Sequence, residues 1–131
     1  MLIKRIKLNN IRSYTEQEIL FPKGSVLLSG DIGSGKTTVL LAIEFALFGL
    51  QKGLIEGNAL LRNGKNDGAV ELELEVEGKT IILRRTLKRK KDSVVQDSAI
   101  LKMNGEEKEL SATELKAFVL NILNYPSQLL K

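Results

Sequence analysis

A short glycine-rich stretch has the residue types and spacing needed to hold phosphate groups. Its residues, Gly30-Asp31-Ile32-Gly33-Ser34-Gly35-Lys36-Thr37, fit the pattern G-x-x-x-x-G-K-[ST]. Its glycines let the backbone turn tightly, so that successive amide groups point inward at phosphate oxygens. Lys36 would reach the β- and γ-phosphates, Thr37 would offer a hydroxyl ligand to Mg2+, and Thr38 would bond the α-phosphate. We therefore expect a phosphate-binding P-loop. A ligand-free glycine turn is the weaker alternative, because it has no need of the Lys-Thr pair.

The flanking segments fit the strand-loop-helix context that this motif requires. Residues 25–29 form a short apolar run typical of a buried strand, and residues 38–48 are apolar and free of glycine, as in a helix. That helix is apolar on nearly every face, so we expect it to be buried on most sides and to end at Gly49. Its one carboxylate, Glu44, is expected to be partly exposed or to form a local ion pair rather than to be catalytic.

Composition sets the broad class. The 131 residues fit one domain spanning residues 1–131, with a net charge of +4 and neither cysteine nor histidine. Disulfides and thiolate metal sites are thereby excluded. The N-terminus does not resemble a signal peptide, and no apolar run approaches the length of a membrane span. We expect a soluble, cytoplasmic protein without a membrane partner; its modest positive charge permits a polyanionic partner without requiring one.

Alternating patterns predict a β-rich second half. Residues 2–10 and 18–21 are expected to pair as strands, and residues 51–68 to form an irregular connection. Further strands are expected at 69–77, 80–90 and 100–103, the last one entering a hairpin turn at Asn104-Gly105. A capping box, Ser111-Ala112-Thr113-Glu114, predicts a final helix that runs to about Asn124.

The strand pair at 69–90 carries charges of both signs. Its glutamates, at 71, 73, 75 and 77, are expected to form a solvated face rather than a metal site. Seven basic residues and no acid follow. Some of them would pair with those glutamates across the strands, and the set as a whole would either form a solvated strand face or track a nucleic-acid phosphate backbone. These basic residues are Lys79, Arg84, Arg85, Lys88, Arg89, Lys90 and Lys91.

A polar turn at residues 10–14 contains Arg12. This side chain would be either solvated or directed at the nucleotide, and charge alone favours solvation.

The sequence resembles the N-terminal end of SMC-superfamily ATPases. The resemblance rests on Ile6-Lys7-Leu8-Asn9-Asn10-Ile11-Arg12-Ser13-Tyr14, on the distance to the P-loop, and on Leu40-Leu41-Ala42-Ile43-Glu44-Phe45-Ala46-Leu47-Phe48-Gly49. It is closest to the DNA double-strand-break repair ATPases of the Mre/Rad nuclease complex, including SbcC-type relatives. The resemblance implies an α/β fold of the P-loop NTPase class: the N-terminal lobe of an ABC-type head, with an antiparallel β-subdomain.

This resemblance also assigns residues. Arg12 and Ser13 match the family's nucleotide-contacting turn, which overturns the solvated interpretation of Arg12, and residues 33–38 match its phosphate loop. Leu61-Arg62-Asn63 lies where the family borders the base and sugar, so Arg62 and Asn63 are candidate contacts. The family usually has Asn in place of Ile32, and an apolar side chain there removes a polar contact near the γ-phosphate.

Motifs that hydrolysis needs are missing from the 131 residues. We find no apolar run ending in Asp-Glu and no Ser-Gly-Gly signature, and Gln128 is the only candidate for the family's Q-loop glutamine. The resemblance therefore implies an ATP- and Mg2+-binding half-head that binds without efficient hydrolysis. It would act in double-strand-break repair through a C-terminal ATPase lobe, ATP-dependent pairing with a second head, a nuclease subunit and DNA. The alternatives are an SMC-type chromosome-organising ATPase and a self-contained small P-loop kinase or GTPase.

Overall fold

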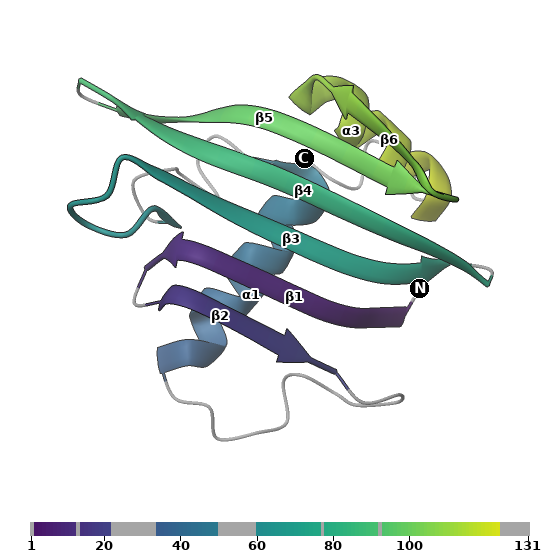
Figure 1. The fold of residues 1–131 in the computed structure, drawn as a ribbon, viewed down its shortest axis with the longest axis horizontal. Helices are drawn as coiled ribbons and strands as arrows, with labels where there is room; N and C mark the ends of the chain where they lie inside the picture. The colour runs from purple at the N-terminus through teal and green to yellow at the C-terminus, as the bar shows by residue number, and fades with distance from the viewer. Residues whose placement is uncertain are drawn as a thin grey trace.

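The computed structural model describes residues 2–12, 14–21, 34–49, 60–76, 78–91 and 93–123. Within these ranges six strands form one antiparallel sheet in the order β2-β1-β3-β4-β5-β6 (Figure 1). The strands are β1 (Leu2–Ile11), β2 (Tyr14–Leu20), β3 (Asp67–Val76), β4 (Lys79–Lys90), β5 (Ser93–Met103) and β6 (Glu106–Leu110). The helices are α1 (Ser34–Phe48) and α3 (Ala112–Leu123). Neither helix is long and apolar enough to cross a membrane.

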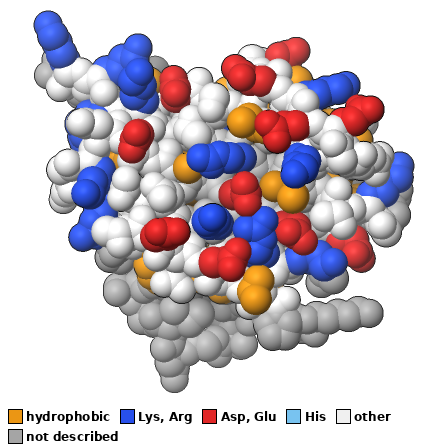
Figure 2. Space-filling model, viewed as in Figure 1, with side chains coloured by type: hydrophobic (Ala, Val, Ile, Leu, Met, Phe, Trp, Pro, Cys, Tyr) orange, Lys and Arg blue, Asp and Glu red, His pale blue; other side chains and the backbone are white. Residues whose placement is uncertain are grey.

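The sheet has one covered face and one open face. Helix α1 contacts β1, β3 and β4, and α3 contacts β5, β6 and α1, so both helices lie on the same side (Figure 1). The open face carries charged side chains of both signs (Figure 2).

Strict alternation on β3 produces this division. Val70, Leu72 and Leu74 are fully buried against the helices, whereas Glu71 and Glu73 lie on the open face and are only partly exposed. Strand β4 continues the pattern, with Leu83 opposite Leu72 in the register. The predicted strands at 69–77 and 80–90 are therefore confirmed to within two residues at each end.

The core lies between the sheet and the two helices. Ala42, Phe45 and Ala46 of α1 are fully buried, and Leu115 and Val119 attach α3 to the same core. The sequence prediction of a helix buried on most sides is confirmed.

Both helices have the expected end signals. Gly49 takes a φ of +79° and donates its N–H to the Phe45 carbonyl at 2.8 Å, which ends α1. At the start of α3, the Ser111 N–H donates to Glu114 Oε1 at 3.0 Å and the Glu114 N–H donates to Ser111 Oγ at 3.1 Å. The predicted capping box is confirmed.

Two strands are longer than the sequence predicted. Strand β5 begins at Ser93 rather than at residue 100, because a bulge interrupts its alternation: Asp97 and Ser98 have no partner in the register between Leu87↔Gln96 and Arg85↔Ala99. Thr86 holds this bulge, since its Oγ1 accepts the Ser98 N–H at 3.0 Å and lies 2.8 Å from Ser98 Oγ. Strand β2 begins at Tyr14 rather than at residue 18, and as a mostly exposed edge strand it has little apolar pattern to detect.

The glutamates of β3 pair with a different strand from the one expected. The sequence suggested the basic residues of β4, but the ion pairs among the described residues come from β1. Arg5 reaches Glu71 at 2.9 Å, Glu73 at 3.3 Å and, on β2, Glu18 at 3.2 Å. Lys4 reaches Glu75 at 3.6 Å. Strand β1 thus supplies the counter-charge for the centre of the open face.

Candidate functional site

Strand β1 ends against the segment that the sequence placed near the base and sugar. Ile11 forms an isolated antiparallel bridge with Leu61, the Arg12 N–H donates to the Leu60 carbonyl at 2.7 Å, and the Arg62 N–H donates to the Asn10 carbonyl at 2.9 Å. Two candidate site residues, Arg12 and Arg62, are therefore neighbours although they lie 50 positions apart in the chain.

Glycine at position 68 permits this close approach. A Cβ at Gly68 would lie 2.8 Å from Leu61 Cδ1 and 2.9 Å from the Asn9 carbonyl oxygen, distances that real Cβ atoms essentially never show. The Asn10 side chain adds a bond to the Asp67 carbonyl at 3.1 Å. Backbone from both segments thus packs directly together, which fixes where Arg12 and Arg62 stand.

Arg12 adopts an unusual backbone conformation. Its φ is +50°, in the left-handed region that side chains other than glycine rarely occupy, and Asn10 nearby has a φ of +54°. The Arg62 Nη1 donates to the Arg12 carbonyl oxygen at 3.0 Å and helps to hold this turn. Such strain persists where the surroundings over-determine it and is common at binding sites. The Arg12 side chain itself is exposed, so it is accessible to a ligand.

Asn63 and Thr38 have contrasting settings. Asn63 is exposed in the turn that follows Arg62, where Gly64 takes a φ of +83°. Thr38 is buried in α1. Several predicted features lie outside the described residues. They are Ser13, the motif residues Gly30, Asp31, Ile32 and Gly33, the predicted strand at 25–29, and Gln128.

Helix α1 begins inside the glycine-rich motif. Its first residues are Ser34, Gly35, Lys36 and Thr37, and its first turn contains no acidic residue. The N-terminus of a helix offers unpaired N–H groups and the positive end of its dipole, and within the described first turn, Ser34 to Thr37, no carboxylate offsets that charge. The start of α1 lies on the side of the molecule where β1 ends and β2 begins (Figure 1, lower left). The motif's hydroxyl and ammonium groups are the donor types that Mg2+ and a polyphosphate require, so these residues fit the ligands predicted from the sequence.

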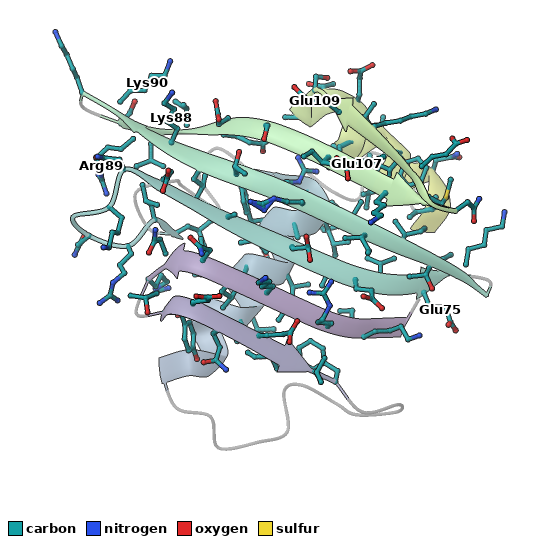
Figure 3. All side chains as sticks on the ribbon, in the orientation of Figure 1. Glu75, Lys88, Arg89, Lys90, Glu107 and Glu109 are labelled. Atoms are coloured by element: carbon teal, nitrogen blue, oxygen red, sulfur yellow. The ribbon has the colours of Figure 1, made fainter. Side chains whose placement is uncertain are left out.

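Further basic residues extend along the same side at the far end of β4. Lys88, Arg89 and Lys90 project there (Figure 3, upper left). Arg89 is partly engaged, because its N–H donates to the Asn66 carbonyl at 2.8 Å and its Nε donates to the Lys65 carbonyl at 2.9 Å. This strand end is therefore tied to the turn that follows Arg62.

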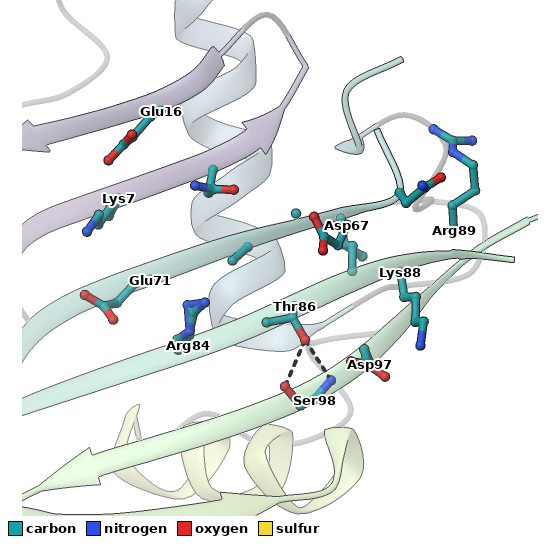
Figure 4. Close-up of a pocket in the computed structure, with 15 residues that line it drawn as sticks. Lys7, Glu16, Asp67, Glu71, Arg84, Thr86, Lys88, Arg89, Asp97 and Ser98 are labelled. Atoms are coloured by element: carbon teal, nitrogen blue, oxygen red, sulfur yellow. Dashed lines mark hydrogen bonds between the residues drawn. The ribbon is translucent and has the colours of Figure 1, made fainter. Parts of the chain in front are cut away.

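A shallow hollow of about 530 Å³ lies on the open face, bounded by Lys88, Asp97, Arg84 and Glu71 among others (Figure 4). Its rim mixes both charge signs, so it does not select an anion. It is separate from the start of α1 and was not predicted as a site.

Arg85 corrects the sequence interpretation. It was counted among seven basic residues that could track a phosphate backbone, but it is 0% exposed on the helix-covered face of β4. Its Nε donates to the Ala46 carbonyl at 2.9 Å, its Nη2 to the Leu47 carbonyl at 3.1 Å and its Nη1 to Gln96 Oε1 at 3.4 Å. Burial lowers the pKa of Arg85 to about 10, so it remains charged at neutral pH. The signal was present in the sequence, because Arg85 takes the place of an apolar residue in the alternation Ile81, Leu83, Leu87.

Solved structures of known proteins share the fold of this chain. The solved structure of the recombination mediator protein RecF-ATP in the RecFOR pathway matches with a TM-score of 0.63 and 19% identity, over 87% of this chain and 29% of that one. The SMC head domain from Thermotoga maritima matches with a TM-score of 0.54 and 22% identity, over 90% of this chain and 42% of that one. The fold, an antiparallel sheet packed on the helix that follows the glycine-rich motif, is that of P-loop ATPase heads.

Similarity in sequence identifies the family within the P-loop ATPase heads. A family model described as an AAA domain matches residues 5–131, and the chain therefore belongs to that family. The DNA double-strand break repair Rad50 ATPase of Methanococcus maripaludis is 34% identical over 94% of this chain, and Arcadin-4 of Pyrobaculum calidifontis is 37% identical over 86%. The sequence resemblance to double-strand-break repair ATPases is thereby confirmed. The chain spans only 12% and 15% of the lengths of these two relatives.

Proposed function

We propose that this chain is the ATP-binding half of an ATPase head that acts in DNA double-strand-break repair. The observation that carries the proposal is the start of α1: the G-x-x-x-x-G-K-T motif runs straight into the first turn of a 15-residue helix that contains no acid there. The sequence similarity to Rad50 ATPases supports the repair role.

In this proposal the loop and the β1 turn hold different parts of the nucleotide. Backbone N–H groups of the loop, with Lys36, would bind the β- and γ-phosphates, while Thr37 would hold Mg2+, which neutralises phosphate charge. Arg12 would supply a further positive charge from the strained turn, with Ser13 beside it. Arg62 and Asn63 would border the base and sugar.

The remaining parts of the reaction would come from other segments. Phosphoryl transfer needs a positioned water and charge stabilisation beyond the phosphate cradle. A C-terminal lobe would bring these groups, and ATP would join two such heads, changing the access of a nuclease subunit to DNA. DNA would be the substrate of the nuclease subunit, and we propose that the protein works in the cytoplasm, as expected from its sequence.

Nucleotide titration tests this proposal. Lys36→Ala should abolish ATP·Mg2+ binding in isothermal titration calorimetry, because the β- and γ-phosphates lose their one flexible ammonium partner. Lys90→Ala, which removes an exposed lysine of β4 instead, should bind ATP as the wild type does. Equal affinity of wild type and Lys36→Ala, with unchanged circular dichroism, would contradict the P-loop assignment.

A further inference from the structure

Arg85 is a buried cation that no step of the proposed function uses. It lies on β4, yet two of its donors reach the backbone carbonyls of Ala46 and Leu47 in the last turn of α1. Carbonyls in the last turn of a helix have no partners within the helix. Arg85 therefore binds carbonyls at the C-terminal end of α1 that the helix itself leaves without a partner.

Charge supports this contact. Among the residues that the structure describes, no carboxylate lies within ion-pairing distance of Arg85. The negative end of the α1 dipole faces the guanidinium instead, and cations are favoured at a helix C-terminus. In the described ranges no buried side-chain donor lacks a hydrogen-bond partner. The hydrogen bonding of the buried Arg85 guanidinium is therefore satisfied within the protein.

Neighbouring residues are shaped around the guanidinium. A Cβ at Gly49 would lie 3.0 Å from Arg85 Nη1 and 2.9 Å from Gln96 Oε1. Any larger residue would displace the guanidinium or the amide. The two bonds from Arg85 to the Ala46 and Leu47 carbonyls, which we call the α1 clamp, join strand β4 to the last turn of α1, and Gln96 adds a contact to the same guanidinium from β5.

The other end of the same helix starts in the phosphate-binding motif. A helix of 15 residues is a rod about 22 Å long, and its hydrogen-bonded backbone transmits an axial shift along its whole length. One face of α1 packs on apolar side chains of the sheet. Apolar contacts have no preferred direction, so they hold the helix against sliding and rotation less strictly than directed hydrogen bonds do. The α1 clamp supplies the directed bonds.

We propose that Arg85 is a positioning residue that fixes α1 along its axis and so sets the place of Lys36 and Thr37 relative to the β1 turn. The inference rests on the proposed function, since it needs ATP at the start of α1. Arg85 itself touches no nucleotide and acts only through the helix.

Two substitutions at Arg85 separate charge from geometry. Arg85→Lys keeps the charge but not the planar fork that reaches two carbonyls and Gln96, and Arg85→Gln also removes the charge. Matched controls are Gln96→Ala, which leaves both bonds to α1 in place, and Leu87→Met, a volume-conserving change in the core two positions along β4. All variants are made in the full 131-residue chain.

The measurement is the dissociation constant of a fluorescent ATP analogue with Mg2+, together with the Mg2+ concentration that gives half-maximal binding. Both are taken well below the melting temperature of each variant, with circular dichroism to verify folding. Arg85→Gln should weaken binding by about tenfold or more, because small misplacements of binding groups cost up to about a hundredfold. It should also raise the Mg2+ midpoint, and Arg85→Lys should fall between it and the wild type. Both controls should bind as the wild type does.

The outcomes are distinct. If Arg85→Lys and Arg85→Gln bind ATP as tightly as the wild type, or if Gln96→Ala loses as much affinity as they do, the positioning role is overturned while the proposed function stands. If the wild type fails to bind ATP, or Lys36→Ala binds equally well, both fail. If Arg85→Gln does not fold, Arg85→Lys decides the question.

Discussion

Two arginines of this sheet, Arg5 and Arg85, illustrate how differently a guanidinium can be held. Arg5 sits on the open face and pairs with carboxylates of two neighbouring strands, whereas Arg85 sits in the core and donates to backbone carbonyls. Burial alone would lower the pKa of Arg5, but hydrogen bonds to Glu71 and Glu73 outweigh it and raise that pKa. For Arg85 burial dominates and lowers the pKa. The same residue type therefore ties strands together at one position and a helix end at the other.

Arg5 should contribute measurably to stability. Its side chain is 17% exposed and bridges β1, β2 and β3. Arg5→Met keeps the apolar stem but leaves Glu71 and Glu73 together without their cation, and we expect a loss of about 1–2 kcal/mol in the free energy of unfolding. Urea denaturation followed by circular dichroism measures this loss.

Lys4 is the matched control for that experiment. It also pairs with a β3 glutamate, but at 3.6 Å and with both side chains more than a third exposed. Lys4→Met should change stability by less than about 0.5 kcal/mol. Equal losses in the two variants would mean that the Arg5 network adds nothing beyond an ordinary surface pair.

Among the elements, α3 depends on its N-terminal cap. Ser111→Ala removes the acceptor for the Glu114 N–H and should destabilise the protein by about 1 kcal/mol. Thermal denaturation measures this, and Thr113→Ala, an exposed change in the same turn, is the control. A variant as stable as the wild type would mean that water satisfies this N–H equally well.

The same cap makes a prediction about pH. Hydrogen bonds from the Ser111 backbone N–H and then from its hydroxyl lower the pKa of Glu114 below its ordinary value of 4.5. Because the folded pKa is the lower one, the stabilisation is complete above pH 4.5 and is lost as the pH falls through the folded value. The difference in melting temperature between wild type and Glu114→Gln should be present at pH 7 and vanish in acid. A difference that persists in acid would assign the effect to packing.

Elements with strong local patterns could be predicted from the sequence, and those shaped by tertiary contacts could not. The alternation of β3, the apolar helix α1 and the capping box of α3 are local features, and each was located correctly. The first half of β5 was missed because its bulge places polar residues, Gln96 to Ser98, where alternation was expected.

The candidate site divides in the same way. The glycine-rich motif stands out by type and spacing, whereas it was the family resemblance that pointed to Arg12 and Arg62. The bond from Arg62 to the Arg12 carbonyl and the clamp at Arg85 join segments 50 and 39 positions apart. No local pattern carries such pairings, although the break in apolar alternation at Arg85 marks an unusual position.

On the scale of the whole molecule, the basic end of β4 is the candidate surface for DNA. Arg85 is excluded from this surface because it is buried. Arg89 is only partly available to DNA, because its Nε donates to the Lys65 carbonyl. Lys88 and Lys90 are exposed there. Reversing both charges, Lys88→Glu with Lys90→Glu, in the assembled head should weaken DNA binding equally for all sequences. The slope of log K against log salt should become shallower by about two, since each phosphate contact contributes about 0.9.

Two exposed lysines elsewhere give a control of equal net charge. Lys102→Glu with Lys108→Glu, on β5 and β6, should leave the salt slope unchanged. If both double variants shift the slope alike, the effect is one of net charge and the DNA does not lie along β4.

Catalysis is the property that should require more than this chain. Among the described residues, the only carboxylate on α1 is Glu44, which is exposed and lies about 12 Å along the helix axis from Lys36. It is therefore too far from the phosphate end of the helix to orient a water molecule at the γ-phosphate. The glycine-rich motif is expected to hold the phosphates, but the described part of α1 offers no carboxylate near enough to them to serve as the base.

We accordingly expect the chain to bind ATP and to hydrolyse it negligibly until a C-terminal half with the missing motifs is added. In the proposed function two heads would have to meet around the nucleotide, so hydrolysis should then depend on protein concentration more steeply than linearly. A turnover assay across a dilution series measures this, with Lys36→Ala as the control for contaminating ATPases. Rapid hydrolysis by the 131-residue chain alone, linear in its concentration and absent from Lys36→Ala, would instead identify a self-contained enzyme. In that case the groups that activate water would have to lie within these 131 residues.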